Sequence, residues 1–370
     1  MTMPAIDVLK AFACVAIVLH HLAFYGPMSD AARPLMPGLV QWFDVYGRMA
    51  VQIFLVVSGF LFAAKFAPAG RVLPIRPLPI LIQRYARLVT PYSAALLLAV
   101  ACSAVAGAWM DHPSVSPAPD LGQFLAHVLL LHDLLDQDAL SAGVWYVAID
   151  FQLFALAVLL LWLPSRFAGR HSALAGLLPP MLVVLMTLAS LFGFNRDAWW
   201  DETALYFFGA FGLGILAWWA SGQFRAGRWL ALLTALAVSA LVVDFRARIA
   251  VATAVMLFLG LARHFGMLHT LPVPAAVVRL SRISYSVFLV HFPLCLLVNM
   301  VVTLAFPDNP VINAMGMVLA VTLSVAGGHL FHERIERHPF PFHVPLRLRF
   351  PARVAAGGWL AALAAVIVAG

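Results

Sequence analysis

Two adjacent histidines, His20 and His21, lie in the second half of an apolar stretch, AFACVAIVLHHLAFYG, that spans residues 11–26 and follows Lys10. An ionisable side chain inside a membrane helix costs about 2.5–3.5 kcal/mol, so it marks a candidate functional site. A neutral imidazole can act as a general base or as a nucleophile. His20 and His21 point about 100° apart on a helix, so that only one of them can face a given partner.

Asp150 and His291 also lie inside apolar stretches. The helical rise places His21 about 16 Å from Lys10, near the middle of a membrane core about 30 Å thick. By the same measure Asp150 and His291 lie about 10 and 12 Å from the starts of their own stretches. Asp150 and His21 can therefore meet, and a carboxylate would orient the imidazole and raise its basicity. The alternative is a structural hydrogen bond made by Asp150.

Arg84 and Arg87 are spaced i and i+3, which places both on one face of a helix. Two guanidinium groups at the end of a span suit a ligand that carries phosphate groups. The alternative is that both residues only anchor the helix end at the cytoplasmic surface.

Other polar residues give weaker signals. Ser58 precedes Gly59, and small residues inside spans usually serve close helix packing. The spacing of His112, His127 and His132 matches no standard ligand pattern, so no metal site is expected.

The whole chain predicts the elements that must position these residues. It has 370 residues, of which 63% are hydrophobic and only 11% charged, whereas soluble domains are about a quarter charged. Apolar stretches long enough to cross a membrane recur along its length. We therefore predict an all-α, polytopic transmembrane helical bundle of about 10–11 spans. The spans fall at 8–26, 49–66, 89–109, 143–163, 174–194, 203–220, 228–243, 249–265, 283–305, 311–332 and 354–369.

The distribution of charge predicts the orientation. With a cytoplasmic N-terminus, only Arg33, Arg48, Arg196, Arg246 and Arg248 of the 23 basic residues lie outside, in agreement with the positive-inside rule. This pattern explains the net charge of +7 without a nucleic-acid partner. Two cytoplasmic segments, 67–88 and 333–353, are basic, and the outer loop 110–142 is acidic and holds a stretch too short to span.

Five stretches together resemble membrane acyltransferase family 3. The first, IDVLKAFACVAIVLHH, resembles the family's opening, where ten residues separate a basic residue from a catalytic histidine, and Lys10 and His21 fit that spacing. The others resemble the family's serine–glycine, arginine, tryptophan–tyrosine and histidine–proline segments, in the family's order. They are AVQIFLVVSGFLFAAKF (50–66), QRYARLVTPY (83–92), GVWYVAIDFQLFAL (143–156) and LSRISYSVFLVHFPL (280–294).

The resemblance implies catalytic roles for His21 and Asp150. It implies substrate binding by a larger set, which comprises Lys10, Arg84, Arg87, Ser58, Tyr146, Tyr285 and His291. The chain departs from the family at two of these positions, with Lys10 where arginine is usual and Asp150 where glutamate is usual. We expect residues 1–335 to form the acyltransferase-like domain, and residues 336–370 to add a basic interfacial segment and an extra transmembrane helix.

The activity that the resemblance implies is acyl transfer (EC 2.3.1) from acyl-CoA, usually acetyl-CoA, to a sugar hydroxyl of a cell-envelope or exported glycan. The expected location is the bacterial inner membrane, with acyl-CoA as co-substrate and no permanently bound cofactor. In the leading hypothesis Arg84 and Arg87 hold CoA phosphates and Asp150 orients His21. The rival is a proton-coupled transporter or flippase, with Asp150, His21 and His291 as a proton relay. The oligomeric state is left open, a homo-oligomer included.

Overall fold

Long apolar helices make up the fold. The computed structural model describes residues 3–70, 76–164 and 173–338. Within these ranges ten helices are long and apolar enough to cross a membrane, and every regular element is helical. A helix satisfies its own backbone hydrogen bonds, which lipid cannot do. The predicted helical bundle is therefore confirmed, while residues 339–370, which include the predicted span at 354–369, lie outside the described residues.

The first half of the chain contributes four of the candidate spans and two further short helices. The elements in order are α1 (Pro4–Tyr25), α2 (Pro27–Ala32), α3 (Pro37–Tyr46), α4 (Ala50–Phe66), α5 (Pro77–Gly107), α6 (Leu121–Val128) and α7 (Val144–Trp162). One of the spans joins α3 and α4, and the two further short helices are α2 and α6. Proline stands in the first turn of α1, α3 and α5, where its fixed φ favours the helix and its missing N–H costs nothing. The short α6 confirms that the apolar stretch in the outer loop does not span.

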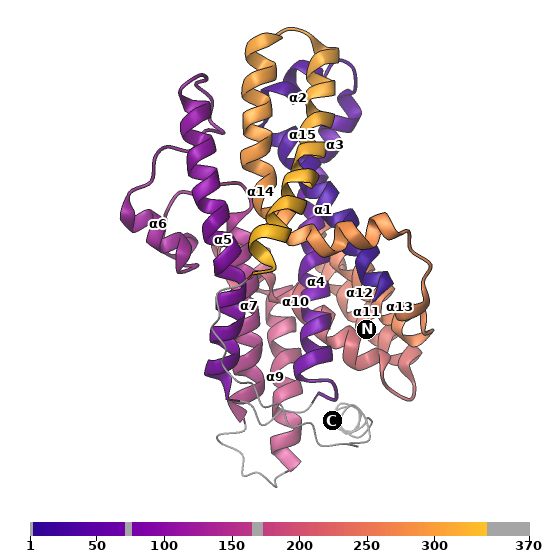
Figure 1. Ribbon diagram of the computed structural model, residues 1–370. Coiled ribbons are helices and arrows are strands. Elements are labelled where there is room, and N and C mark those ends of the chain that lie inside the picture. The colour runs from indigo at the N-terminus through magenta and orange to yellow at the C-terminus, as the bar shows by residue number, and fades with distance from the viewer. Residues whose placement is uncertain (1–2, 71–75, 165–172, 339–370) are drawn as a thin grey trace.

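The second half contributes the remaining candidate spans. They are α9 (Ala173–Phe192), α10 (Ala204–Ser221), α11 (Ala226–Val243), α12 (Ala247–His264), α14 (Ala275–Ala305) and α15 (Pro310–Phe331), with the short α13 (Met267–Thr270) before α14. Helices α14 and α15 stand side by side as an antiparallel pair, and a π-helical turn at His332–Glu336 follows α15 (Figure 1).

Helix α10 forms the centre of one half of the bundle, and α1 and α14 form the other. Helix α10 packs against α4, α7, α9, α11 and α12, and nearly all of its side chains are buried. Helix α1 packs against α3, α4 and α14, and α14 also contacts α5. Helix α7 contacts both α4 and α5. Helices α1, α4, α5, α7 and α14 are therefore neighbours, and together they carry all of the predicted site residues.

Two glycines let α4 and α10 approach each other closely. A Cβ atom on Gly59 would lie 1.9 Å from the carbonyl oxygen of Phe211, and one on Gly214 would lie 2.0 Å from that of Val56. No real Cβ atom tolerates such a distance from a backbone atom, so the two helices can pack this way only with glycine at both positions. Because Ser58 precedes Gly59, this contact also sets the position of Ser58.

We expect Gly59→Ala to destabilise the bundle by about 1–3 kcal/mol, because the added methyl group forces α4 and α10 apart. The measurement is thermal unfolding of the purified protein in detergent. Gly227→Ala is the matched control, since Gly227 is also helical but a Cβ atom there meets nothing within 4 Å. Equal melting temperatures for the two variants would contradict the close packing.

Candidate active site

His21 on α1 and His291 on α14 form a buried pair. Nδ1 of His21 lies 2.6 Å from Nε2 of His291. The ring planes are nearly parallel, inclined by 9°, with centroids 4.9 Å apart. His291 is fully buried and His21 is 9% exposed. The structure thus brings together two histidines that lie 270 residues apart in the sequence.

The hydrogen bonds of this pair define the tautomer of each neutral ring. Nδ1 of His291 lies 2.7 Å from the carbonyl oxygen of Phe288, which can only accept, so Nδ1 carries the proton. The Nε2 atom of a neutral His291 is then an acceptor, and it must accept from Nδ1–H of His21. The Nε2 atom of His21 therefore keeps an unprotonated lone pair, which is what a general base or nucleophile needs.

His20 has a different and structural partner. Its Nδ1 atom donates to the carbonyl oxygen of Phe43, at 2.9 Å, near the end of α3. This bond ties α3 to α1. The expectation that only one of the two adjacent histidines can face a given partner agrees with this geometry.

Asp150 lies in a second cluster, with one residue from each of two other helices. Its Oδ1 atom accepts from Ser58 Oγ on α4, at 2.8 Å, and its Oδ2 atom accepts from Arg84 Nη2 on α5. The Arg84 guanidinium also lies over the ring of Phe154, 5.3 Å from its centroid. Asp150 itself is almost completely buried. The cluster therefore links α4, α5 and α7 through a buried ion pair.

This arrangement corrects two parts of the leading sequence hypothesis. Asp150 does not orient His21, because its hydrogen bonds go to Ser58 and Arg84 and the partner of His21 is His291. Arg84 does not present a free guanidinium at the surface, because it is paired with Asp150. The sequence gives the depth of each residue along its own helix, but the angle about the helix axis decides which partner it meets.

Tyr146 and Tyr285 lie near the Asp150 cluster, and Tyr146 also extends toward the histidine pair. The Tyr146 ring packs edge-on against Phe288, with centroids 5.3 Å apart, one turn from His291. Tyr285 donates its hydroxyl proton to the carbonyl oxygen of Leu88, at 3.0 Å. Both hydroxyl groups lie within electrostatic range of Arg84 and Asp150. All of the predicted site residues of α4, α5, α7 and α14 except Arg87 thus contribute to one of these adjoining clusters.

Lys10 and Arg87 lie toward the side of the bundle predicted to be cytoplasmic. Arg87 is exposed, unlike Arg84 one turn earlier on α5. Lys10 on α1 is half-buried and lies within electrostatic range of Asp7, Glu336 and Arg87. The helical rise separates Lys10 from His21 by about 16 Å, as predicted from the sequence. Lys10 and Arg87 therefore lie about half the thickness of the membrane core from the histidine pair.

The outer loop places Gly143 beside the histidine pair. His127 donates from Nδ1 to the carbonyl oxygen of Gln123, at 2.8 Å, and its Nε2 accepts from the Leu140 backbone N–H, at 3.2 Å. These bonds hold the loop against α6. Gly143 then precedes α7 with a φ of +84°, and a Cβ atom on it would lie 3.5 Å from Cε1 of His21. Only a residue without a side chain takes this backbone conformation readily.

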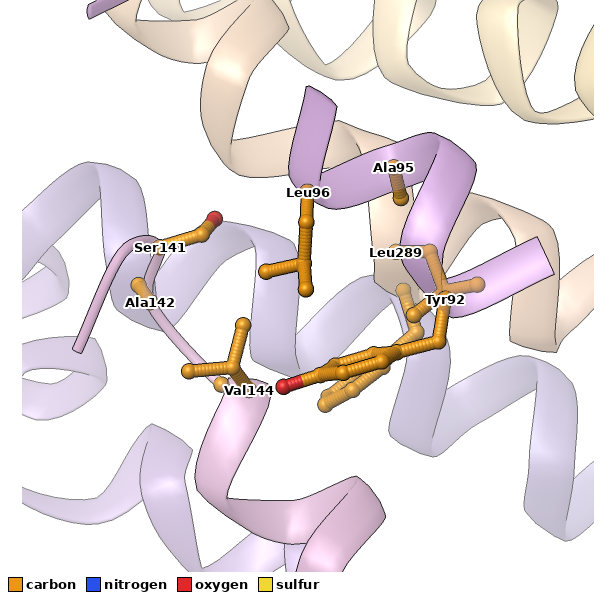
Figure 2. Close-up of a pocket in the computed structure, with 9 residues that line it drawn as sticks. Tyr92, Ala95, Leu96, Ser141, Ala142, Val144 and Leu289 are labelled. Atoms are coloured by element: carbon orange, nitrogen blue, oxygen red, sulfur yellow. The ribbon is translucent and has the colours of Figure 1, made fainter. Parts of the chain in front are cut away.

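A small cavity lies between α5 and the start of α7 (Figure 2). It is close to the histidine pair, because Gly143 lines it and also lies beside His21. Its volume is about 10 Å³, enough for about one water molecule. Gly143 and Phe288 line it, together with Tyr92 and Leu96 of α5. The sequence hypothesis did not include Tyr92 or Gly143, although Tyr92 is the last residue of the stretch QRYARLVTPY. Tyr92 could have been found from the sequence, because it is a tyrosine inside an apolar span and a buried tyrosine hydroxyl needs a hydrogen-bond partner.

The fold and the buried site together define a multi-pass helical membrane protein with a histidine pair at its centre. A family model described as an acyltransferase domain, that of acyltransferase family 3, matches residues 3–329. The chain therefore belongs to acyltransferase family 3 and is an acyltransferase. Neither the curated proteins nor the solved structures contain a match to this chain.

Proposed function

We propose that this protein transfers an acyl group, specifically acetyl, from acyl-CoA to a hydroxyl group of a cell-envelope or exported glycan, at the bacterial cytoplasmic membrane. The free Nε2 lone pair of His21 carries this proposal. It is held in one tautomer by His291, which is itself held by the Phe288 carbonyl. A buried base with a fixed proton acceptor behind it suits the activation of a hydroxyl group.

In the direct route, His21 acts as a general base. The acceptor hydroxyl gives its proton to Nε2 of His21 while its oxygen forms a bond to the thioester carbonyl carbon, and the carbonyl electron pair moves to oxygen. When this tetrahedral intermediate collapses, the C–S bond breaks. The CoA thiolate takes the proton from Nε2, which leaves the ester, the CoA thiol and neutral His21.

In the two-step route, Nε2 of His21 attacks the thioester carbon itself. The C–S bond breaks, the CoA thiolate leaves, and the acyl group stays on the imidazole. The acceptor hydroxyl then displaces the imidazole, and its proton balances the charge of the thiolate. Both routes give the same products and need the same free lone pair.

The donor approaches from the cytoplasmic side in this proposal. Lys10 and Arg87 would bind the phosphate groups of acyl-CoA there, because a guanidinium and an ammonium group both recognise phosphate. The distance of about 16 Å from Lys10 to His21 is one that an extended pantetheine arm can cover. Arg84 contributes to the wall of this path through its ion pair with Asp150 rather than as a phosphate ligand.

We expect Arg87→Ala to raise the KM for acetyl-CoA about 10- to 150-fold with little effect on kcat, because a charge-assisted hydrogen bond to phosphate contributes about 1.5–3 kcal/mol. The measurement is the initial rate in proteoliposomes as a function of acetyl-CoA concentration. Arg228→Ala is the control, since Arg228 is an exposed arginine near the start of α11, which is not one of the site helices. A KM equal to that of the control would assign Arg87 to membrane anchoring.

The proposed function is tested by mass spectrometry of envelope glycans from a deletion strain. We expect an acetyl ester to disappear and to return with the wild-type gene but not with a His21→Ala gene. A transporter would instead move a solute across liposomes without consuming acetyl-CoA. Glycans that keep every ester after deletion would contradict the proposed acceptor class.

A further inference from the structure

The hydroxyl group of Tyr92 has no hydrogen-bond partner in the described part of the chain, although Tyr92 is only 1% exposed. A buried, unpaired hydroxyl costs about 1–3 kcal/mol, so it requires an explanation. Tyr92 lies on α5, and its hydroxyl reaches toward Val144 in the space between α5 and the start of α7 (Figure 2). An unpaired donor at the edge of a cavity is suited to a ligand atom that is absent when the site is empty.

The cavity beside Tyr92 is small. Its volume of about 10 Å³ admits about one water molecule, and a methyl group is of similar size. Leu96 of α5 is 1% exposed and closes one side of it, and Ala95 and Ala142 also line it. The cavity therefore has room for the methyl group of an acetyl chain but not for a longer acyl chain.

Gly143 and Phe288, which line the cavity, also lie beside the histidine pair. A Cβ atom on Gly143 would lie 3.0 Å from Cζ of Phe288 and 3.5 Å from Cε1 of His21. Cε1 is bonded to Nε2, the atom that carries the free lone pair. Because Gly143 has no side chain, its backbone can lie against both the imidazole and the cavity.

We propose that this cavity, here called the Tyr92 pocket and lined by residues that include Tyr92, Ala95, Leu96, Ala142, Gly143 and Phe288, receives the methyl end of the donor's acyl group during transfer. In the pocket Tyr92 donates a hydrogen bond to the thioester carbonyl oxygen, and Leu96 limits the acyl chain to acetyl. This inference rests on the proposed function and adds the residue that stabilises the reacting carbonyl and the residue that selects the acyl chain.

The role of Tyr92 follows from the charge that develops in the reaction. When the acceptor or His21 attacks the carbonyl carbon, the carbonyl oxygen becomes negative, and a donor placed there lowers the barrier. Removal of one such donor costs about 10²–10³ in kcat. Tyr92 is suited to this role because no other group in the described structure accepts its proton.

The test uses full-length protein in proteoliposomes, with the glycan fraction of the native membrane as acceptor and release of free CoA from acetyl-CoA as the signal. We expect Tyr92→Phe to lower kcat by about 10²–10³ while the KM for acetyl-CoA changes little. Thermal stability should be unchanged or raised, since the variant removes an unpaired buried hydroxyl. Unchanged kcat in a folded Tyr92→Phe protein would overturn the role of Tyr92.

A second variant tests the pocket independently of Tyr92. Wild-type protein should prefer acetyl-CoA to butyryl-CoA by at least about tenfold for each additional methylene. Leu96→Ala should enlarge the pocket and shift this ratio at least about tenfold toward butyryl-CoA. An unchanged ratio would show that the acyl chain lies elsewhere.

The outcomes separate this inference from the proposed function. If wild-type protein releases no CoA from either donor, the proposed function fails. If the wild type is active but Tyr92→Phe and Leu96→Ala both behave as the wild type does, only the Tyr92 pocket is refuted. Leu153→Ala serves as the control for lost volume, because Leu153 is a fully buried leucine of α7 that does not line the pocket.

Discussion

His21→Ala is expected to lower the rate of acyl transfer by about 10²–10⁴-fold, which is the range that a general base contributes. The loss should be larger if His21 also carries the acyl group, because the two-step route then closes entirely. The fold should persist, since the variant leaves the ion pair of Asp150 and the packing of α4 and α10 intact. The measurement is the initial rate of ester formation in proteoliposomes, with thermal unfolding as a check on structure.

His20→Ala is the matched control for this prediction. His20 is the neighbouring histidine, is similarly buried, and binds the Phe43 carbonyl instead of His291. Its loss should lower stability by about 1 kcal/mol through the missing hydrogen bond and leave kcat within a few-fold of the wild type. Equal losses of kcat in the two variants would contradict the assignment of His21 as the base.

In the proposed function, His291 would act on the reaction through His21, as a positioning residue. His291→Gln keeps an acceptor for Nδ1–H of His21, whereas His291→Ala removes it. We therefore expect the glutamine variant to retain more of the wild-type kcat than the alanine variant at equal KM. A structural role alone would make both variants equally active once folded.

Asp150→Asn is expected to destabilise the protein by about 3–5 kcal/mol, because it leaves the Arg84 guanidinium buried without its counter-charge. The double variant Asp150→Leu with Arg84→Met should recover much of this loss, since a buried ion pair can be replaced by apolar side chains of similar volume. The measurement is thermal unfolding of the single and double variants, analysed as a double-mutant cycle.

The contrary result has a specific meaning for Asp150. If Asp150→Asn melts as the wild type does but transfers acyl groups far more slowly, then the carboxylate acts in the chemistry, as the sequence hypothesis held. The structure instead connects it with Ser58 and Arg84, so stability rather than kcat is expected to change first.

Hydropathy alone predicts the helical bundle but misplaces some helix starts. The predicted spans at 89–109 and 283–305 belong to helices that begin at Pro77 and Ala275. Hydropathy marks the part of a helix that lies in lipid, whereas the helix itself extends into the polar boundary. Pro77 and Pro274 give the better signal, because proline favours the start of a helix and cannot continue one.

The sequence singles out candidate site residues, but it does not predict all of their contacts. Lys10 and His21 become candidates through their spacing in the sequence. Asp150 becomes a candidate because its neighbours in the sequence are apolar. The contact between His21 and His291 depends on how α1 and α14 rotate against each other, which hydropathy does not encode. Tyr92 and Gly143 become candidates only when the empty space between α5 and α7 is known.

The most direct test of the central claim is the transfer of a labelled acetyl group from acetyl-CoA to the envelope glycan fraction. Proteoliposomes that contain wild-type protein and His21→Ala protein of equal thermal stability are compared. We expect label in the glycan and a matching amount of free CoA with the wild type, and neither with His21→Ala. Equal labelling by both proteins would contradict the assignment of His21 as the residue that activates the acceptor or carries the acyl group.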